Sequence, residues 1–377
     1  MKNFVMASDA VTMGHPDKLC DQISDAVVDA WLAEGARDGV NAECALASGV
    51  AFLSVRSGAA APVDAAQLVR RVVGAAGYDG IDEDRMSVIL DLSRDETMSA
   101  DLLSAGIARH MVTAIGYACE GPGAMPAPVM LARGLAAGLD SARASGRLGW
   151  LLPDAKAQVA VRFEDRRPVQ VTAVALSLGT VEAMSEESIA SILRDEVIAP
   201  VVARQGLAQA EGLRLSVQAQ NGPGGPAVHT GLTGRKTGED SYGAFVRHSG
   251  SALSGKDPSR IDRVADYAAR HAARGVVAAG LARECEVQLS YIPGDAAPAS
   301  IEVDCHDSGS MPDAEIRRLL TAKIDFRLVA MVERFGLWDL PAAREGRFYQ
   351  RLATYGQIGR DDLQTPWDAP TLAAELG

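Results

Sequence analysis

Cysteine is scarce in this sequence, and no Cys-x-x-Cys pair is present. The five cysteines are an odd number, so neither a disulfide framework nor a zinc ribbon is indicated. No run of about 18 apolar residues occurs, which argues against a transmembrane helix. The first residues, Met1 to Phe4, lack the apolar region of a secretory signal. We therefore expect a cytoplasmic protein.

Positive charge is also in the minority. The chain has 37 Lys and Arg against 49 Asp and Glu, a formal net charge of −12. Such a balance argues against non-specific binding to nucleic acids or membranes, so a local cluster of basic residues indicates a specific site. The 377 residues, 47% of them hydrophobic, are enough for two or three domains with ample cores.

One basic cluster lies between Gly231 and Arg263, in two glycine-containing turns. Residues 231–236 read GLTGRK, and residues 254–263 read SGKDPSRIDR. Glycine lets a backbone approach a ligand closely, and Lys and Arg make charge-assisted hydrogen bonds to phosphate oxygens. The carboxylates of Asp257 and Asp262 could hold a hard cation such as Mg²⁺ against those phosphates. The segment therefore suits a phosphate site, but a solvated hairpin with a charged tip has the same pattern.

A second candidate site follows the first predicted strand, Phe4 to Val11. Residues 14–18 read GHPDK and precede an amphipathic helix that extends to about Glu34. Pro16 suits the first helical turn, where its missing N–H costs nothing. Unpaired N–H groups at a helix start favour anions, which places His15 and its neighbours Asp17 and Lys18 at a candidate anion site. The alternative is that His15 only caps the helix.

Hydrophobic patterns along the rest of the chain predict strands and helices in alternation. We expect further strands at 43–55, 86–92 (a buried strand), 157–163, 169–178, 285–292 and 299–303. We expect further helices at 65–74, 125–139, 186–202, 262–279 and 314–326. The order strand, helix, strands recurs three times, which predicts three similar α+β units with helices on one face of each sheet. We place the domains at 1–100, 105–223 and 224–377.

Several different motifs occur at widely separated places along the chain. They are GHPDK at 14–18, DQISDA at 21–26, PDAKAQV at 153–159, GGP at 224–226, GLTGRK at 231–236, SGKDP at 254–258, TYG at 354–356 and GRDD at 359–362. Together they resemble the S-adenosylmethionine synthetase (methionine adenosyltransferase) family over nearly the whole chain. The resemblance implies three α+β domains about a pseudo-threefold axis. It also implies a homodimer, or a dimer of dimers, that pairs through flat sheet faces and has its active sites at the subunit interface.

The reaction implied by this resemblance is attack of the methionine sulfur on C5′ of ATP. The whole triphosphate leaves and is then hydrolysed to phosphate and diphosphate. Sulfur is already a good nucleophile, so the protein must mainly stabilise the negative charge that grows on the leaving group. Preorganised donors in a dry cleft do this, and alignment of the reacting atoms supplies the rest.

The resemblance also implies roles for individual residues. The nucleotide and triphosphate would contact His15, Lys18, Asp154, Lys156, Gln220, Asn221, His229, Arg235, Lys236, Ala252 and Lys256. The catalytic residues among them would be His15, beside the bridging oxygen that leaves C5′, and the phosphate-neutralising Lys156, Arg235 and Lys256. The implied cofactors are Mg²⁺, held by Asp17 and Asp262, and K⁺, held by Glu43.

The acceptor half of the implied site departs from the family pattern. Arg56 occupies the position of a Glu that meets the methionine ammonium group, and His110 and His229 occupy the positions of two Asp residues. Arg260 replaces the usual Lys, which keeps the charge but not the shape. These four residues are the candidate acceptor-binding set. In addition, Gln220 and Asn221 replace an Arg-Phe pair whose ring stacks on adenine, and the region 93–99 replaces the gate segment, with Arg94 or Asp95 at the position of its Gln.

Three functions remain open at this point. The first is a methionine adenosyltransferase that uses ATP and methionine. The second is a homologue that expels triphosphate but uses another nucleotide or another, anionic acceptor. Arg56 repels an ammonium group, and an unpaired buried charge costs several kcal/mol. The third is a regulatory subunit that pairs with a standard synthetase. The presence of His15, Asp17, Lys156 and Lys256 argues against this third function.

Overall fold

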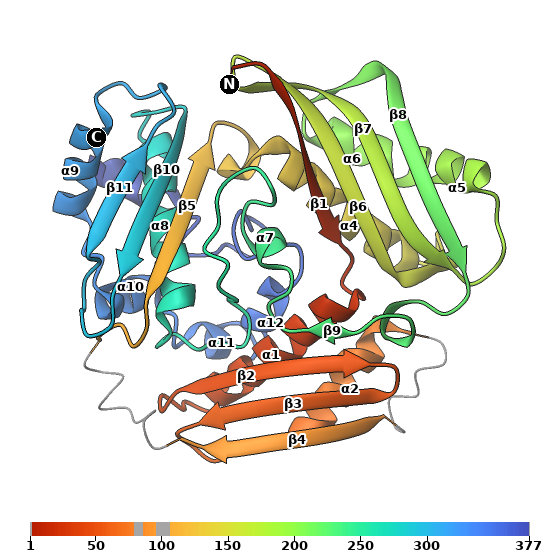
Figure 1. Ribbon diagram of the computed structural model, residues 1–377, viewed down its shortest axis with the longest axis horizontal. Helices are drawn as coiled ribbons and strands as arrows, with labels where there is room; N and C mark the ends of the chain where they lie inside the picture. The colour runs from red at the N-terminus through yellow and green to blue at the C-terminus, as the bar shows by residue number, and fades with distance from the viewer. Residues whose placement is uncertain (1, 79–85, 96–105, 377) are drawn as a thin grey trace.

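The computed structural model describes residues 2–78, 86–95 and 106–376, which form three β-sheets with helices packed against them (Figure 1). The strands are β1 (Phe4–Val11), β2 (Val40–Ala47), β3 (Val50–Ser57), β4 (Ser87–Arg94), β5 (Val112–Cys119), β6 (Leu151–Glu164), β7 (Arg167–Thr180), β8 (Ala208–Asn221), β9 (Gly231–Leu232), β10 (Glu284–Tyr291) and β11 (Ser300–Asp304). The fold is therefore of the mixed α+β class, as predicted.

The helices lie between and after these strands. They are α1 (Pro16–Ala33), α2 (Ala65–Ala76), α4 (Ala127–Ala144), α5 (Glu186–Leu193), α6 (Ala199–Arg204), α7 (Thr237–Asp240), α8 (Ile261–Ala278), α9 (Asp313–Lys323), α10 (Leu328–Phe335), α11 (Leu340–Ala343), α12 (Tyr349–Leu352) and α13 (Ala373–Leu376). A π-helical turn, Arg194–Ile198, joins α5 to α6. None of the helices in the described ranges is long and apolar enough to cross a membrane.

Each sheet contains one strand from a distant part of the sequence. The strand orders are β1-β6-β7-β8, β11-β10-β5 and β4-β3-β2-β9. Figure 1 makes the exchange visible by colour: red β1 lies beside yellow-green β6, orange β5 beside blue β10, and green β9 beside red β2. The domain bounds that we predicted, 1–100, 105–223 and 224–377, stay a prediction. Strands β1, β5 and β9 each pair with a strand from another of these three ranges.

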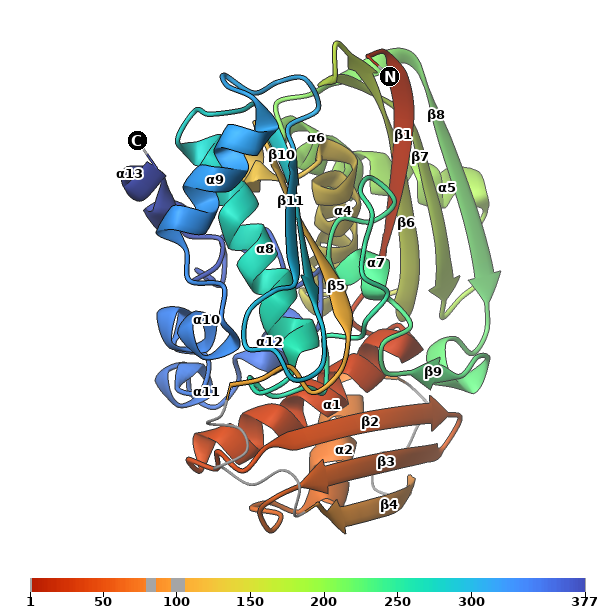
Figure 2. The same ribbon diagram turned by 60° about the vertical axis from the view of Figure 1, so that its left-hand side comes forward.

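A helix of 18 residues packs against each sheet. Helix α1 contacts β2, α4 contacts β1 and β6, and α8 contacts β5 and β10. Figure 2 shows α8 and α9 along one side of the β5-β10-β11 sheet. Helix α1 begins at Pro16, where the missing N–H costs nothing, and its cap is His15, whose Nδ1 accepts the amide hydrogen of Asp17 at 3.2 Å. The helix predicted after residue 18 is thus confirmed, and so is the strand before it.

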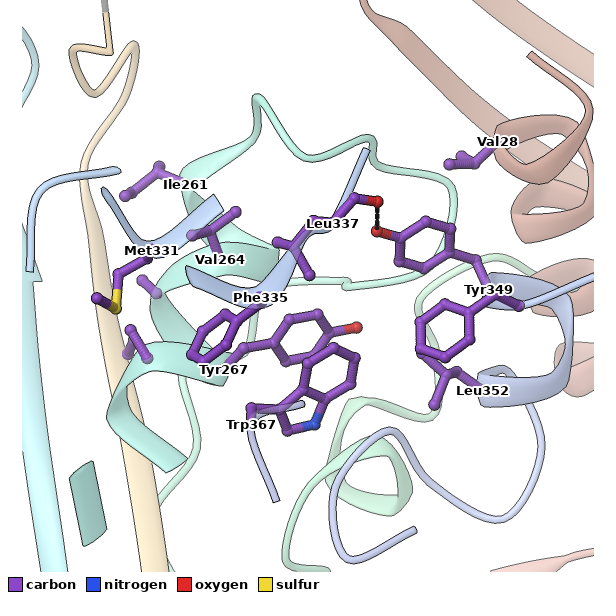
Figure 3. Close-up of a cluster of buried hydrophobic side chains, with 14 of the residues drawn as sticks. Val28, Ile261, Val264, Tyr267, Met331, Phe335, Leu337, Tyr349, Leu352 and Trp367 are labelled. Atoms are coloured by element: carbon purple, nitrogen blue, oxygen red, sulfur yellow. Dashed lines mark hydrogen bonds between the residues drawn. The ribbon is translucent and has the colours of Figure 1, made fainter. Parts of the chain in front are cut away.

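The core between α8 and the C-terminal helices is rich in aromatic rings (Figure 3). The rings of Tyr267 and Trp367 are stacked at 3.6 Å between centroids, and Phe335 meets Trp367 edge-on. The hydroxyl of Tyr349 donates to the carbonyl of Leu337 at 2.8 Å, which satisfies the one polar atom of that buried ring. The C-terminal segment is therefore part of the core that supports α8.

Two strand predictions are wrong in detail. The predicted strand 43–55 is a hairpin of β2 and β3, which turns at Ser48, a residue with a positive φ of 49°. The predicted buried strand 86–92 is β4, which lies at the edge of its sheet and is largely exposed. A run of apolar residues occurs both in a central strand and in an edge strand with an exposed apolar face, so it does not distinguish the two. Strands β5 and β8 were not predicted.

One face of the β4-β3-β2-β9 sheet is left uncovered by the residues that the structure describes, and we call it the open sheet face. Helices α1 and α2 cover the opposite face. On the open side, Ile89, Phe52, Ala45 and Leu232 form a row across the four strands. Phe52 is 43% exposed and Ile89 54%. A row of exposed apolar side chains on a flat sheet is typical of a protein interface.

Candidate active site

Helix α1 carries four aspartates spaced four residues apart, Asp17, Asp21, Asp25 and Asp29. Their side chains lie on one face of the helix. Each accepts a backbone amide hydrogen from the last 150 or so residues of the chain. The donors are Leu232 (3.0 Å to Asp17), Gly234 (2.8 Å to Asp21), Gly255 (2.8 Å to Asp25) and Tyr349 (2.9 Å to Asp29). The helix therefore positions both glycine-containing turns that the sequence indicated as phosphate sites.

Buried cations neutralise the middle of this aspartate row. Lys18 Nζ lies 2.9 Å from Asp21 and 2.6 Å from Asp240, and Arg263 lies 2.5 Å from Asp25. Burial would lower the pKa of Lys18, but the two carboxylates outweigh it and raise that pKa. Lys18 is only 1% exposed, so this structure gives no support to its predicted contact with a nucleotide. The ion pairs of Lys18 with Asp21 and Asp240 instead hold α1 to the segment after Lys236.

A first cation cluster forms around the start of α1, and we call it the His15 cluster. Lys236 Nζ lies 2.6 Å from Asp17 Oδ2, and Arg235 lies 3.7 Å from Asp17 Oδ1. Burial alone would raise the pKa of Asp17, but the hydrogen bonds from Lys236 and from the Leu232 amide, together with the charge of Lys236, outweigh it and keep that pKa below its usual value. Asp17 is therefore ionised and available to a hard cation. Arg235 is half-exposed, and its guanidinium has room to reach a ligand.

His15 is held in the neutral form. Burial, with help from the nearby Lys236 ammonium group, lowers the pKa of His15 to about 3. Because Nδ1 accepts the Asp17 amide hydrogen, the single ring proton of the neutral imidazole belongs on Nε2. The ring can thus donate one hydrogen bond without adding positive charge to the site.

A cavity of about 470 Å³ opens beside His15. Asp154 and Lys156 line it from β6, two residues apart and thus on one face of that strand. Gln220, at the end of β8, and His229, in the turn before β9, close the other side. His229 Nε2 lies 2.9 Å from Asp154 Oδ2. The structure thus brings together five residues predicted to bind a nucleotide.

Lys156 has an ion-pair partner that the sequence did not indicate. Its Nζ lies 2.5 Å from Asp9 Oδ2, and both side chains are partly exposed. Asp9 and Lys156 come from the neighbouring strands β1 and β6. An exposed pair of this kind contributes little to stability, so Lys156 can exchange Asp9 for a phosphate oxygen at small cost.

A second cluster contains Lys256, Asp262 and His110, and we call it the Lys256 cluster. Lys256 Nζ lies 3.3 Å from Asp262 Oδ1, and His110 Nε2 lies 2.6 Å from Asp262 Oδ2. Burial would raise the pKa of Asp262, but Lys256 and His110 keep it below its usual value. Gly255 has φ of 81°, and a Cβ there would lie 2.0 Å from the Ala42 carbonyl oxygen. Only glycine therefore permits this turn to approach β2 so closely.

The two clusters occupy two positions along one edge of β2. Leu232, next to the His15 cluster, pairs with Ala45, whereas Lys256 bridges to Asn41. Four residues of strand separate these positions by about 13 Å. One Mg²⁺ ion binds its oxygen ligands at about 2.1 Å. We therefore expect Asp17 and Asp262 of the same chain to bind separate ions.

The remaining candidates lie around these clusters. Glu43 and Arg56 have exposed side chains on the open sheet face, and Asn221 is exposed at the end of β8. Ala252 packs against Gly234, and Arg260 caps α8 with its Nε buried and, among the described residues, without a hydrogen-bond partner. The gate segment predicted at 93–99 lies beyond the described residues after Asp95.

The acid Asp266, one turn after Asp262 on α8, makes stability depend on pH. Burial, with repulsion from Asp262, raises the pKa of Asp266 to about 8. The folded state therefore holds a proton that the unfolded state has lost, so this contribution is complete below pH 4 and falls as the pH rises toward 8.

Asp266→Asn has a similar shape and no such proton. We expect its free energy of unfolding, relative to wild type, to increase between pH 5 and pH 8 by up to about 1.4 kcal/mol per pH unit. Urea unfolding at both pH values measures this. A difference between variant and wild type that is the same at pH 5 and pH 8 would contradict it.

Sequence reasoning missed the positioning residues of this site. The spacing of four between Asp17, Asp21, Asp25 and Asp29 is visible in the sequence, and it indicates one helix face. Four carboxylates on one face of an otherwise buried helix require partners. This need for partners was the feature of the sequence from which the four aspartates could have been recognised as positioning residues. Tyr78, whose hydroxyl donates to the Gly14 carbonyl at 2.5 Å, had no comparable signal.

Comparison with known families gives three matches that together span almost the whole chain. The models are the S-adenosylmethionine synthetase N-terminal domain (residues 3–96), central domain (106–221) and C-terminal domain (223–369). Two similar proteins are S-adenosylmethionine synthases of Synechococcus sp. strains RCC307 and CC9902, each 39% identical over 100% of this chain and 100% and 99% of their own lengths. The S-adenosylmethionine synthase of Prochlorococcus marinus strain MIT 9313 is 39% identical over 98% of this chain and 95% of its own length.

Proposed function

This chain belongs to the S-adenosylmethionine synthetase family, and we propose that it transfers the adenosyl group of ATP to the sulfur of L-methionine. The products are S-adenosylmethionine, phosphate and diphosphate. The observation that supports this most directly is the neutral, capped His15 beside a cavity lined by Lys156, with Arg235 and Lys236 paired to the neighbouring Asp17. The full-length relatives are named synthases, so neither the alternative acceptor nor the regulatory subunit is favoured.

His15 acts on the leaving group. As sulfur attacks C5′, negative charge grows on the bridging oxygen between C5′ and the triphosphate. An N–H donor at Nε2 of His15 stabilises this charge, and its geometry is set in advance by the Asp17 amide. The low pKa of His15 keeps the ring from carrying a full charge that would bind ATP and the transition state equally well.

Cations absorb the charge on the three phosphoryl groups. Lys156, Arg235 and Lys236 take this role in the His15 cluster, and Lys256 takes it in the Lys256 cluster. Mg²⁺ suits Asp17 and Asp262, because each carboxylate oxygen can accept a second partner and Mg²⁺ prefers one or two carboxylates together with phosphate oxygens. Bound Mg²⁺ would neutralise charge on the triphosphate. The exposed Glu43 on the open sheet face offers an oxygen ligand for K⁺.

A homodimer would unite the two clusters. If the open sheet faces of two copies pack about a two-fold axis near the middle of β2, the Asn41 end of one strand lies opposite the Ala45 end of the other. The Lys256 cluster of one copy then meets the His15 cluster of its partner, and the same holds at the second site. Glu43 and Arg56, which lie on this face, would border both sites.

We assign Arg56 to the acceptor. Methionine carries a carboxylate as well as an ammonium group, and a guanidinium pairs with a carboxylate through two parallel hydrogen bonds. His110 and Arg260 lie in or beside the Lys256 cluster, from which they would reach the same acceptor across the interface. His229, at the cavity beside His15, would contact the ribose or the acceptor.

Product formation tests the proposed reaction. Purified protein is incubated with ATP, L-methionine, Mg²⁺ and K⁺, and S-adenosylmethionine, phosphate and diphosphate are quantified. We expect equal amounts of the three products. No S-adenosylmethionine above a control without methionine would overturn the proposal.

A charge at the centre of the open sheet face should separate the subunits. Phe52→Glu places a carboxylate among Ile89, Ala45 and Leu232, and burying it without a partner costs several kcal/mol per subunit. We expect a folded monomer by light scattering and loss of nearly all activity, because each site needs both copies. Val181→Glu, at a similarly exposed apolar residue (51%), is the control. A Phe52→Glu dimer with normal activity would contradict the interface.

A further inference from the structure

We propose that His15, Asp154 and His229 form a binding site for a divalent transition-metal ion of the Zn²⁺ class, distinct from the magnesium and potassium sites. These three residues each offer one ligand atom, and the three atoms lie within 4.8 Å of one another. Two imidazoles and one carboxylate are a ligand set that suits Zn²⁺, Co²⁺ or Ni²⁺, whereas Mg²⁺ prefers oxygen ligands alone.

The three residues converge from separate parts of the fold. His15 caps α1, Asp154 lies on β6, and His229 lies in the turn before β9. His229 Nε2 is already 2.9 Å from Asp154 Oδ2, and the rings of His15 and His229 are 5.0 Å apart between centroids. Around one ion with bonds of about 2.1 Å, tetrahedral ligand atoms lie about 3.4 Å apart. Small side-chain rotations therefore convert the observed set into a coordination shell.

The surroundings provide what such a site needs besides its ligands. All three residues line the same 470 Å³ cavity, and His229 is partly exposed, so an ion has a path of entry. Binding of the ion at Nε2 of His15 requires the other tautomer, in which Nδ1 carries the ring proton. Nδ1 then gives up the Asp17 amide hydrogen that it accepts in this structure and donates toward Asp17 Oδ2, which lies 3.9 Å away. A carboxylate behind a metal-binding histidine is the usual arrangement, since it fixes the ring and its tautomer.

The consequence for the reaction rests on the proposed function. His15, Asp154 and His229 are also the groups that we assign to the nucleotide, so the ion and ATP use the same side chains. Binding of Zn²⁺ and binding of ATP are then mutually exclusive. The protein would bind ATP and methionine only while this site is free of a transition metal.

Cobalt provides a direct readout that does not involve turnover. Metal-free protein without nucleotide or Mg²⁺ is titrated with Co²⁺, and the visible absorption of the bound ion is followed before displacement by Zn²⁺. We expect one ion per chain. We also expect His229→Asn to weaken binding by at least about tenfold, and saturating ATP to raise the apparent Kd by a similar factor.

His248→Asn is the matched control, because His248 is another exposed histidine and its Nδ1 accepts the amide hydrogen of the nearby Gly250. It should bind Co²⁺ like wild type. An absent absorption band, or equal affinity in His229→Asn and wild type, would overturn the metal site and leave the proposed reaction intact. Failure to form S-adenosylmethionine in a buffer that contains Mg²⁺ and K⁺ but no transition metal would overturn the reaction and leave the Co²⁺ site intact.

Discussion

Two inactive variants of this chain are expected to restore each other when they are produced in the same cell. His15→Asn removes the donor of the His15 cluster, and Lys256→Met removes the ammonium group of the Lys256 cluster. Each variant alone should lose about two to three orders of magnitude in kcat, the usual cost of one charge-stabilising group. A co-expressed mixture should recover about a quarter of wild-type activity, because half of the dimers are mixed and each has one intact site of two.

The physical reason lies in the placement of the two clusters on β2. Within one chain they are about 13 Å apart along the strand, attached at Ala45 and Asn41. A two-fold arrangement of open sheet faces takes one cluster from each copy. A mixed dimer therefore has one site with both defects and one site with none.

The control pairs two variants of the same cluster. Co-expression of His15→Asn with Asp17→Asn should restore nothing, because every site then receives a defective His15 cluster. Activity per dimer is measured after tandem affinity purification of mixed dimers with two different tags. Pure mixed dimers of His15→Asn with Lys256→Met that remain as inactive as either variant would show that both clusters act within one chain.

Asp25→Ala is expected to destabilise the fold by about 3–5 kcal/mol, the cost of leaving a buried charge without its partner. Asp25 and Arg263 are both fully buried, and their side chains lie 2.5 Å apart. Arg263 also donates from Nε to the Leu253 carbonyl at 3.0 Å and lies over the Tyr349 ring at 4.4 Å. It cannot reach water when Asp25 is removed. The Gly255 amide loses its acceptor as well.

Urea unfolding at a fixed protein concentration measures this change, since the dimer that we propose would make the midpoint depend on concentration. Asp339→Ala is the control. Asp339 pairs with Arg37 at 2.8 Å, but their side chains are 76% and 58% exposed, so its loss should cost less than about 1 kcal/mol. Replacing Arg263 with Met in the Asp25→Ala background should recover part of the stability. An Asp25→Ala variant within 1 kcal/mol of wild type would refute this account.

Local patterns predicted those parts of the fold that local forces determine. The proline and the apolar spacing after His15 predicted α1. The glycine turns were predicted to approach a ligand, and the structure shows that Gly255 approaches the backbone of β2 closely. Lys18 shows the limit of such reasoning. Its charge suggested an anion contact, but its environment consists of Asp21 and Asp240, and Asp240 is 222 residues away in sequence. No local pattern reveals that a lysine is enclosed by its own protein.

The candidate site also has features that the sequence predicted and features that it did not predict. The sequence supplied the residue types, and their motifs predicted a common nucleotide site for His15, Asp154 and His229. These three residues line one cavity, and their role there stays a prediction. The sequence did not predict that Lys256 and Asp262 lie in a separate cluster, because this depends on which residues of β2 each turn pairs with. Register is set by packing across a whole sheet, and that information is distributed over distant segments.

The exchange of β1, β5 and β9 among the sheets has a consequence for synthesis on the ribosome. Ser8 of β1 pairs with Val159 of β6. After β1 has been synthesised, the ribosome therefore adds about 150 further residues before the neighbouring strand β6 is available for pairing. At about 5–20 residues per second this interval lasts roughly 10–30 s. During that time an unpaired apolar edge is available to chaperones and to other nascent chains. Truncated forms that end before β6 should therefore aggregate rather than fold as a smaller unit.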